Sequence, residues 1–253
     1  MKALILMTRI PIPGKTKTRL MDILTREECA EIHKCFLLDL FNIFEYIKED
    51  VDIYLTYTPE GSLNIIENIM PKYTKSFPQV GDTLGERMEN AFNNVFNLGY
   101  EKIVLIGSDI PSMQPQDIVK GFGILESNDI CLGTTFDGGY YLIGMKKLYK
   151  EVFDESIKWG KKSVFESTMH IANNLELSIG LVSKHLDIDT KEDIISFKEK
   201  VNSGYFLGKV LPKNTVDYLE KIRSDNTILS DEERREDSHI FKWKELIYEG
   251  VWE

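Results

Sequence analysis

A short basic segment follows the first apolar run of the chain. Residues 1–20 contain no acidic residue, whereas the whole chain of 253 residues has a formal net charge of -10. The cations of this segment are Lys2, Arg9, Lys15, Lys17 and Arg19. Positive charge gathered locally in an acidic protein indicates a small anionic ligand, while a nucleic-acid surface needs a broad excess of Lys and Arg. We therefore predict that the loop at residues 8–20 binds the phosphates of a nucleotide or nucleotide sugar, and we expect no nucleic-acid partner.

The composition of this loop fits a phosphate-binding role. The prolines at positions 11 and 13 stiffen it, and Gly14 frees one backbone step. Its cations can thereby be held around a diphosphate: Arg9, Lys15, Lys17 and Arg19. The segment 14–16 resembles the end of a P-loop, but that pattern needs a glycine at position 9, where this chain has Arg9. A solvated basic loop without a ligand is the alternative.

A carboxylate follows a buried strand in the segment 103–111. Ser108 and Asp109 come directly after the apolar run Ile103–Gly107. The carboxyl ends of parallel strands present ligands at one edge of a sheet, so Asp109 should face the basic loop. A carboxylate there can hold a divalent cation that bridges phosphate oxygens. Capping of the following helix is the alternative role for Asp109.

A second acidic segment lies at residues 185–193. In an extended chain, His185, Asp187 and Asp189 fall on one side. If that side faces Asp109, a carboxylate-rich site for Mg²⁺ or Mn²⁺ results, with Asp189 as the preferred second ligand. A lone histidine is more often structural, and Thr190 with Asp193 is also typical of a helix start.

Further candidates belong to a second substrate. Asp137 is followed by two glycines, Gly138 and Gly139, and by Tyr140, so the backbone can approach a ligand closely there, although a hairpin turn explains the pattern equally well. Trp159 could line an acceptor pocket or could simply pack. No Ser-His-Asp or Cys-His pattern indicates covalent catalysis.

One arginine stands at an unusual place in a predicted helix. Arg87 follows the start signal Thr83–Glu86 and so falls in the first turn, where the helix dipole disfavours a cation unless an anion is near. Arg87 therefore faces the ligand or pairs with Glu86 or Glu89.

Apolar runs and helix starts alternate along the chain. The runs predict strands at 3–7, 51–57, 103–107, 130–133, 140–145 and 179–182. Capping boxes predict helix starts at Thr25, Thr83 and Ser163, each with Glu three residues later. This alternation indicates an α/β fold with a mostly parallel central sheet.

Composition limits the remaining possibilities. Hydrophobic residues make up 42% of the chain, enough for one large core, and the three cysteines form no disulfide framework or zinc motif. The first seven residues are too short for a signal peptide, and no later run reaches the ~18 apolar residues of a membrane span. We expect a cytoplasmic protein.

The composition changes near residue 205. We predict a nucleotide- or nucleotide-sugar-binding domain at 1–204 and an acidic, helical C-terminal appendage at 205–253. Apolar residues near the end, among them Ile240, Trp243 and Trp252, are expected to dock on the domain or on another subunit, which would make a homo-oligomer through this tail.

Five segments together resemble a known family. They are Pro-Gly-Lys-x-Lys-Thr-Arg-Leu at 13–20, Leu-Gly-Glu-Arg-Met at 84–88, Gly-Ser-Asp-Ile-Pro at 107–111, Asp-Gly-Gly-Tyr-Tyr at 137–141 and Asp-Ile-Asp-Thr-Lys-Glu-Asp at 187–193. In this order they resemble the glycosyltransferase family associated with radical-SAM/selenium-domain proteins. The first and third segments are also similar to 2-phospho-L-lactate guanylyltransferase, and the last to molybdenum cofactor guanylyltransferases.

The resemblance implies a three-layer, Rossmann-like nucleotide-diphosphosugar transferase (GT-A type) fold. It implies that Arg9, Lys15, Lys17 and Arg19 meet phosphate, that Asp109 and Asp189 hold the metal, and that residues 137–140 contact the second substrate. A metal-dependent glycosyltransferase with a small-molecule acceptor is the leading hypothesis, in which Lys17 and Arg19 of the basic loop and the cation held by Asp109 neutralise the leaving nucleoside diphosphate. The alternative is a nucleotidyltransferase, in which a phosphorylated acceptor attacks the α-phosphate of a nucleoside triphosphate and pyrophosphate leaves.

Overall fold

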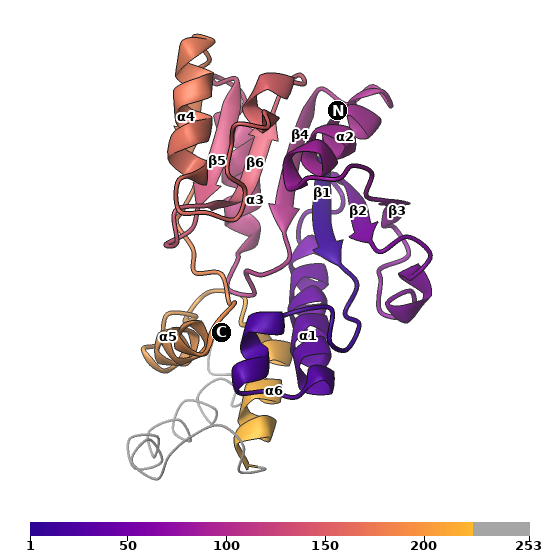
Figure 1. Ribbon diagram of the computed structural model, residues 1–253, viewed down its shortest axis with the longest axis vertical. Helices are drawn as coiled ribbons and strands as arrows, with labels where there is room; N and C mark the ends of the chain where they lie inside the picture. The colour runs from indigo at the N-terminus through magenta and orange to yellow at the C-terminus, as the bar shows by residue number, and fades with distance from the viewer. Residues whose placement is uncertain (225–253) are drawn as a thin grey trace, which may run out of the picture.

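The computed structural model describes residues 1–224 as a three-layer α/β fold (Figure 1). The strands are β1 (Lys2–Arg9), β2 (Asp52–Thr58), β3 (Lys75–Pro78), β4 (Lys102–Gly107), β5 (Ile130–Thr134), β6 (Tyr140–Met145) and β7 (Ile179–Leu181). The α-helices are α1 (Arg26–Phe44), α2 (Leu84–Phe96), α3 (Pro115–Ile124), α4 (Val164–Asn174), α5 (Lys191–Asn202) and α6 (Lys213–Ser224). Short 3₁₀ helices lie at Thr18–Asp22, Leu63–Ile65 and Lys150–Phe153.

One sheet of seven strands organises the described residues, in the order β3-β2-β1-β4-β6-β5-β7. β6 is antiparallel to both β4 and β5, and the other neighbouring strands pair in parallel. The prediction of a mostly parallel sheet is therefore confirmed. β3 was not predicted, because its four residues, Lys75–Pro78, are exposed or half-buried and form no apolar run.

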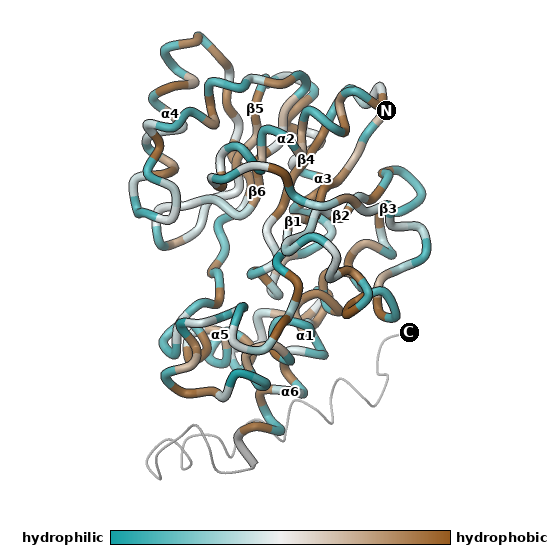
Figure 2. Tube along the Cα trace, turned by 45° about the vertical axis from the view of Figure 1, so that its right-hand side comes forward, coloured by the Kyte–Doolittle hydropathy of each residue, from teal (hydrophilic) through white to brown (hydrophobic). Residues whose placement is uncertain are grey.

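Helices cover both faces of the sheet. On one face, Leu4 and Leu6 of β1 pack with the apolar stripes of α1 and α3, and on the other face Ala3 and Ile5 pack with α2 and α4. Hydrophobic residues run along the central strands, while hydrophilic residues dominate the outer loops (Figure 2). The alternation of β1 side chains between the two layers follows from the two-residue period of a strand.

The helix starts follow their capping signals with one exception. Thr25, Thr83 and Thr190 each accept a bond from the backbone three residues on, in complete capping boxes. The box predicted at Ser163 was wrong: α4 does begin there, but the Ser163 side chain makes no capping bond. Its backbone has ψ near 0° rather than the extended conformation of a capping residue.

The far side of α1 carries a third apolar cluster. Phe36 of α1 packs there with Phe197 of α5 and Leu219 of α6, beside one end of the sheet (Figure 1). The buried carboxylate of Asp39 accepts four bonds from the backbone and side chains of Asn214 and Thr215, at the start of α6. Residues 205–224 therefore pack on the domain. The division at residue 204 stays a prediction, and the apolar tail residues 240–252 lie outside the described residues.

No helix within residues 1–224 is long and apolar enough to cross a membrane.

Candidate functional site

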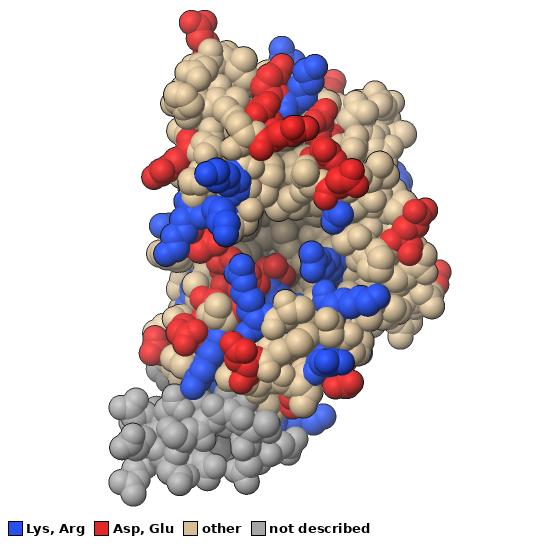
Figure 3. Space-filling model, viewed as in Figure 1, with Lys and Arg blue, Asp and Glu red and all other residues tan. Residues whose placement is uncertain are grey.

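A cavity of about 740 Å³ opens at the carboxyl ends of β1 and β4. Its walls come from the basic loop, the start of α2, the β5–β6 turn, residues 159–164 and residues 187–189. Figure 3 shows this face hollowed at its centre, with Lys and Arg side chains gathered around the hollow and acidic side chains within it. The strand order brings these distant segments together, as expected for the ligand crevice of an open α/β sheet.

Lys17 is the most enclosed cation of the cavity, with a side chain only 3% exposed. Its ammonium lies 2.7 Å from Asp109 Oδ1 and 3.0 Å from Asp189 Oδ1, and it donates to the carbonyl oxygen of Ile188 at 2.7 Å. An ammonium group has three N–H donors, so these three acceptors satisfy it completely. Burial alone would lower the pKa of Lys17, but the two carboxylates outweigh that effect and raise it. Lys17 is thus a permanent cation that holds the two carboxylates together.

Asp109 and Asp189 meet at the cavity as the sequence predicted. The backbone N–H of Ile188 donates to the carbonyl oxygen of Asp109 at 3.0 Å, which joins the two acidic segments directly. Burial would raise the pKa of Asp109, but Lys17 and His33 act against it and keep the pKa below its usual value. Asp109 does not cap the next helix, because α3 begins only after Gln114. The capping alternative is therefore wrong.

The two carboxylates fit a divalent cation only in partnership with a ligand. Among residues 1–224, no group of three or more His, Cys, Asp or Glu side chains is arranged to hold a metal ion. Mg²⁺ in phosphate-transfer sites is commonly held by one or two carboxylates together with phosphate oxygens and water. Asp109 is 42% exposed and Asp189 33% exposed, so both retain oxygen surface toward the cavity. The donor set therefore suits a cation that arrives with a phosphate.

The other predicted phosphate contacts divide into two groups. Four of these residues line the cavity: Arg9, Arg19, Arg87 and Ser108. The guanidinium of Arg19 is exposed and lies 3.4 Å from Asp189, so it is free to reach a ligand. Lys15 and Gly14 do not line the cavity. Gly14 has a φ of +77°, so its role visible here is to let the loop turn.

The contacts of Arg87 decide between the two roles predicted for it, facing the ligand or pairing with Glu86 or Glu89. Its Nε donates to the carbonyl oxygen of Gly81 at 2.8 Å. The Glu86 carboxylate instead accepts from backbone N–H groups at the start of the helix, as a capping partner. Arg87 lines the cavity, and the described residues give it no acidic partner.

The β5–β6 turn is both a hairpin turn and a wall of the cavity. Asp137 accepts bonds from the Thr135 hydroxyl and from the Gly139 backbone, and Asp137, Gly139 and Tyr140 line the cavity. Gly138 does not line it. A Cβ at Gly138 would stand 2.1 Å from the carbonyl oxygen of Lys162, so this glycine allows the turn to cross that segment.

Trp159 lines the cavity beside Tyr140, and their rings meet edge to face with centroids 6.4 Å apart. Gly85 of α2 makes room for the indole, because a Cβ there would stand 2.7 Å from Trp159 Nε1. Asp187 also lines this part of the cavity. Burial and the nearby Asp137 raise the pKa of Asp187 to about 6.

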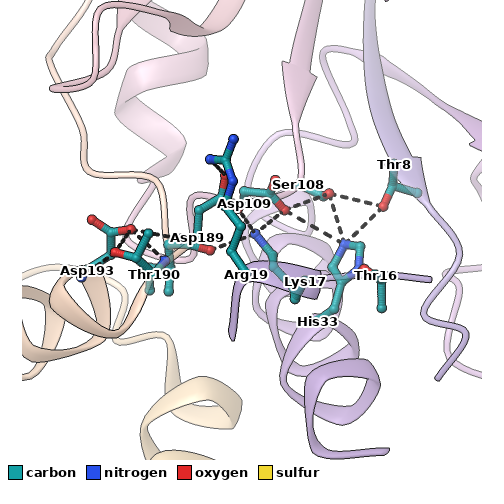
Figure 4. Close-up of polar contacts among 11 residues, drawn as sticks. Thr8, Thr16, Lys17, Arg19, His33, Ser108, Asp109, Asp189, Thr190 and Asp193 are labelled. Carbon is teal, nitrogen blue, oxygen red and sulfur yellow. Dashed lines mark hydrogen bonds and ion pairs between the residues drawn. The ribbon is translucent and has the colours of Figure 1, made fainter. Parts of the chain in front are cut away.

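Sequence reasoning missed His33, a buried residue of α1 that lines the cavity and lies among the polar side chains of Figure 4. Its Nδ1 meets the Thr16 hydroxyl, and its Nε2 lies 3.1 Å from Ser108 Oγ and 3.3 Å from Thr8 Oγ1. Burial lowers the pKa of His33 to about 4, although Asp109 acts in the opposite direction. The one sequence signal was a histidine in an otherwise apolar helix face, which is typical of many core positions.

A second buried histidine supports the acidic segment. His185 Nε2 lies 2.8 Å from Asp117 Oδ2, and its Nδ1 lies 3.1 Å from Ser112 Oγ. Spacing along the chain gave no sign of this Ser-His-Asp arrangement. All three side chains are buried and none lines the cavity, so the arrangement presents no nucleophile to a substrate. His185 is structural, as the sequence favoured.

Comparisons with known proteins agree with this fold. A family described as "Uncharacterized protein conserved in bacteria (DUF2064)" matches residues 46–161. A protein of Desulfovibrio desulfuricans G20, provisionally assigned as a nucleotide-diphospho-sugar transferase, is similar over 88% of this chain and 95% of its own, with 28% identity and a TM-score of 0.78. No curated protein matches the chain.

Two more distant structures share the fold. A cytidylyltransferase from Leptospira borgpetersenii serovar Hardjo-bovis has 17% identity and a TM-score of 0.51, with 91% of this chain and 97% of that chain covered. The 4-diphosphocytidyl-2C-methyl-D-erythritol synthase of Anaerococcus prevotii has 15% identity and a TM-score of 0.54, with 79% and 98% covered. The chain thus has the nucleotide-diphospho-sugar transferase fold, and its central residues 46–161 match the DUF2064 family.

Proposed function

We propose that the protein is a metal-dependent glycosyltransferase that uses a nucleotide-diphosphosugar donor and a small-molecule acceptor. The observation that carries the proposal is the meeting of Asp109 and Asp189 on Lys17, at a cavity rimmed by three arginines. The likeness to the provisionally assigned sugar transferase supports it. The fold alone does not choose between sugar transfer and nucleotidyl transfer.

We assign the two substrates to different parts of the cavity lining. Arg9, Arg19 and Arg87 line it and would bind the diphosphate of the donor, with the fixed forks that suit phosphate oxygens. The carboxylates of Asp109 and Asp189 would hold a Mg²⁺ or Mn²⁺ ion brought by the nucleotide. Such an ion, when bound, neutralises the charge that develops on the leaving diphosphate.

The reaction needs one bond to form and one to break. The acceptor oxygen bonds to the anomeric carbon of the sugar, and the bond from that carbon to the diphosphate oxygen breaks, with its electron pair leaving on the nucleoside diphosphate. The arginines stabilise that charge in place, which is the main source of rate acceleration in this scheme. The acceptor would lie against Tyr140 and Trp159, where Asp137 or Asp187 can receive the proton that the acceptor hydroxyl loses.

A ligand panel tests the proposal. The protein is incubated with Mg²⁺ or Mn²⁺ and with nucleotide sugars or nucleoside triphosphates, and binding, sugar release and pyrophosphate release are measured. We expect a nucleotide sugar to bind and to be hydrolysed slowly without an acceptor. Pyrophosphate release from a triphosphate, without turnover of any nucleotide sugar, would instead establish nucleotidyl transfer.

A matched pair of variants locates the activity. Asp109→Asn removes one negative charge from the cavity, and Asp50→Asn removes the same charge from an exposed turn outside it. We expect Asp109→Asn to abolish metal-dependent nucleotide binding while the melting temperature changes little, and Asp50→Asn to behave as the wild type. Equal binding by both variants would contradict the metal role of Asp109.

A further inference from the structure

His33 contacts both the phosphate loop and the segment that carries Asp109. The ring belongs to α1, is 2% exposed, and reaches three hydroxyl groups on three separate segments. Thr16 immediately precedes Lys17, and Ser108 immediately precedes Asp109. One imidazole therefore contacts the neighbour of the buried cation and the neighbour of its carboxylate partner (Figure 4).

The hydroxyl contacts whose direction is defined favour one protonation of the His33 ring. The Asp109 carboxylate can only accept, so Ser108 donates its hydroxyl proton to Asp109 Oδ1, at 3.4 Å. Thr8 donates either to the carbonyl oxygen of Arg9 at 2.8 Å or to Ser108 Oγ at 3.0 Å. Neither hydroxyl then has a proton left for His33 Nε2. With these directions the ring carries its proton on Nε2 and donates to Ser108, and Nδ1 accepts from Thr16.

We propose that His33 is a positioning residue of the site, a neutral Nε2–H imidazole that orders the phosphate loop and Asp109 together. The bonds run in one direction, from Thr16 through His33 and Ser108 to Asp109. This inference concerns how the site is held and rests on the proposed function for its catalytic consequence.

The conformation of Lys17 shows why such support is needed. Lys17 has a φ of +49°, a left-handed backbone conformation that is unfavourable for a residue with a side chain. That conformation brings its ammonium to the carboxylates, and the Thr16 side chain next to it is 2% exposed and bonded to His33. A strained residue persists only where its surroundings fix it. The His33 ring supplies one such constraint on the loop.

Three substitutions separate positioning from simple packing. His33→Leu keeps the volume but removes both polar contacts. His33→Gln can place its amide near the Nε2 position and keep the bond to Ser108. Ser108→Ala removes the hydroxyl that joins His33 to Asp109, together with its contact to Thr8. The matched control is His170→Leu, because His170 is exposed on α4 and contacts only Asn174 among the described residues.

The probe is inorganic pyrophosphate with Mg²⁺, titrated calorimetrically into the full-length protein. We expect binding about tenfold weaker or worse for His33→Leu and Ser108→Ala, because each breaks the chain of bonds between the loop and Asp109. Binding should stay within about threefold of the wild type for His33→Gln and be unchanged for His170→Leu. Equal binding by the wild type and His33→Leu would overturn the proposal. So would equal losses for His33→Gln and His33→Leu.

A spectroscopic measurement does not depend on any ligand. Nitrogen-15 NMR of the imidazole should show the His33 proton on Nε2 and a bare Nδ1, with both signals shifted in Ser108→Ala. A proton on Nδ1 in the wild type would overturn the proposal even if His33→Leu fails to fold. Failure of the wild type to bind any phosphate probe, with the Nε2–H signature intact, would count against the proposed function and leave the hydrogen-bond order standing.

Discussion

The pH dependence of folding offers a sharp test of the buried His33. Its pKa is lowered from 6.5 to about 4, chiefly by burial. Between these values the unfolded chain binds a proton that the folded chain does not bind. The contribution of His33 to the free energy of unfolding is therefore fully present above about pH 6.5, and it is lost as the pH falls through about 4.

The size of the effect follows from the two pKa values. The interval of about 2.5 pH units between them corresponds to about 3 kcal/mol, of which about 2.5 kcal/mol should be lost between pH 7.5 and pH 4.5. No large discount for solvent applies, since the His33 side chain is 3% exposed. The expected change is thus well above the error of a denaturation experiment.

The assay is urea unfolding of the wild type, His33→Gln and His170→Gln at the two pH values. Groups that do not interact with His33 titrate equally in all three proteins, so the difference between variants reports His33 together with its effect on Asp109. We expect the advantage of the wild type over His33→Gln to shrink by about 2.5 kcal/mol at pH 4.5. His170→Gln should retain the pH dependence of the wild type, because His170 is exposed. Identical pH dependence for the wild type and His33→Gln would refute the reasoning.

Three further predictions rest on other parts of the molecule. Gly138→Ala should destabilise the fold by more than about 2 kcal/mol in thermal unfolding, because the new Cβ would stand 2.1 Å from the Lys162 carbonyl oxygen. The control Gly123→Ala, in open space within α3, should be neutral or stabilising in the same assay. Asp39→Ala should lower stability by about 1–3 kcal/mol in urea and speed hydrogen exchange in α6, since four donors lose their acceptor; unchanged exchange would contradict this role. Arg19→Gln should weaken Mg²⁺–pyrophosphate binding several-fold in calorimetry without changing the melting temperature, because the Arg19 side chain is 68% exposed. A lower melting temperature for this variant would contradict a purely ligand-binding role.

The sequence predicted the parts of the site that depend on strand ends. Asp109 follows an apolar strand, so the parallel sheet places it at the ligand edge, whereas Asp189 was expected there only if its extended segment faced Asp109. The sheet itself was predictable because its inner strands are continuous apolar runs. β3 was not, because it is short and polar.

The remaining features depend on contacts that no local pattern encodes. The sequence predicts phosphate contact for both lysines of the loop, but the structure buries Lys17 and leaves Lys15 exposed and outside the cavity lining. That difference depends on a left-handed backbone angle at Lys17. The role of His33 depends on hydroxyls at positions 8, 16 and 108, which the fold brings together from three segments.

The ion pair between Lys17 and Asp189 also bears on the order in which the molecule folds. It joins residues 172 positions apart in the chain. A contact of such long range has to wait until both segments have been brought together by the intervening sheet, because closing so large a loop early is entropically unfavourable. We therefore expect the core to assemble first and the phosphate loop to take its final shape last. Substitutions at Lys17 should then accelerate unfolding while leaving the rate of folding nearly unchanged.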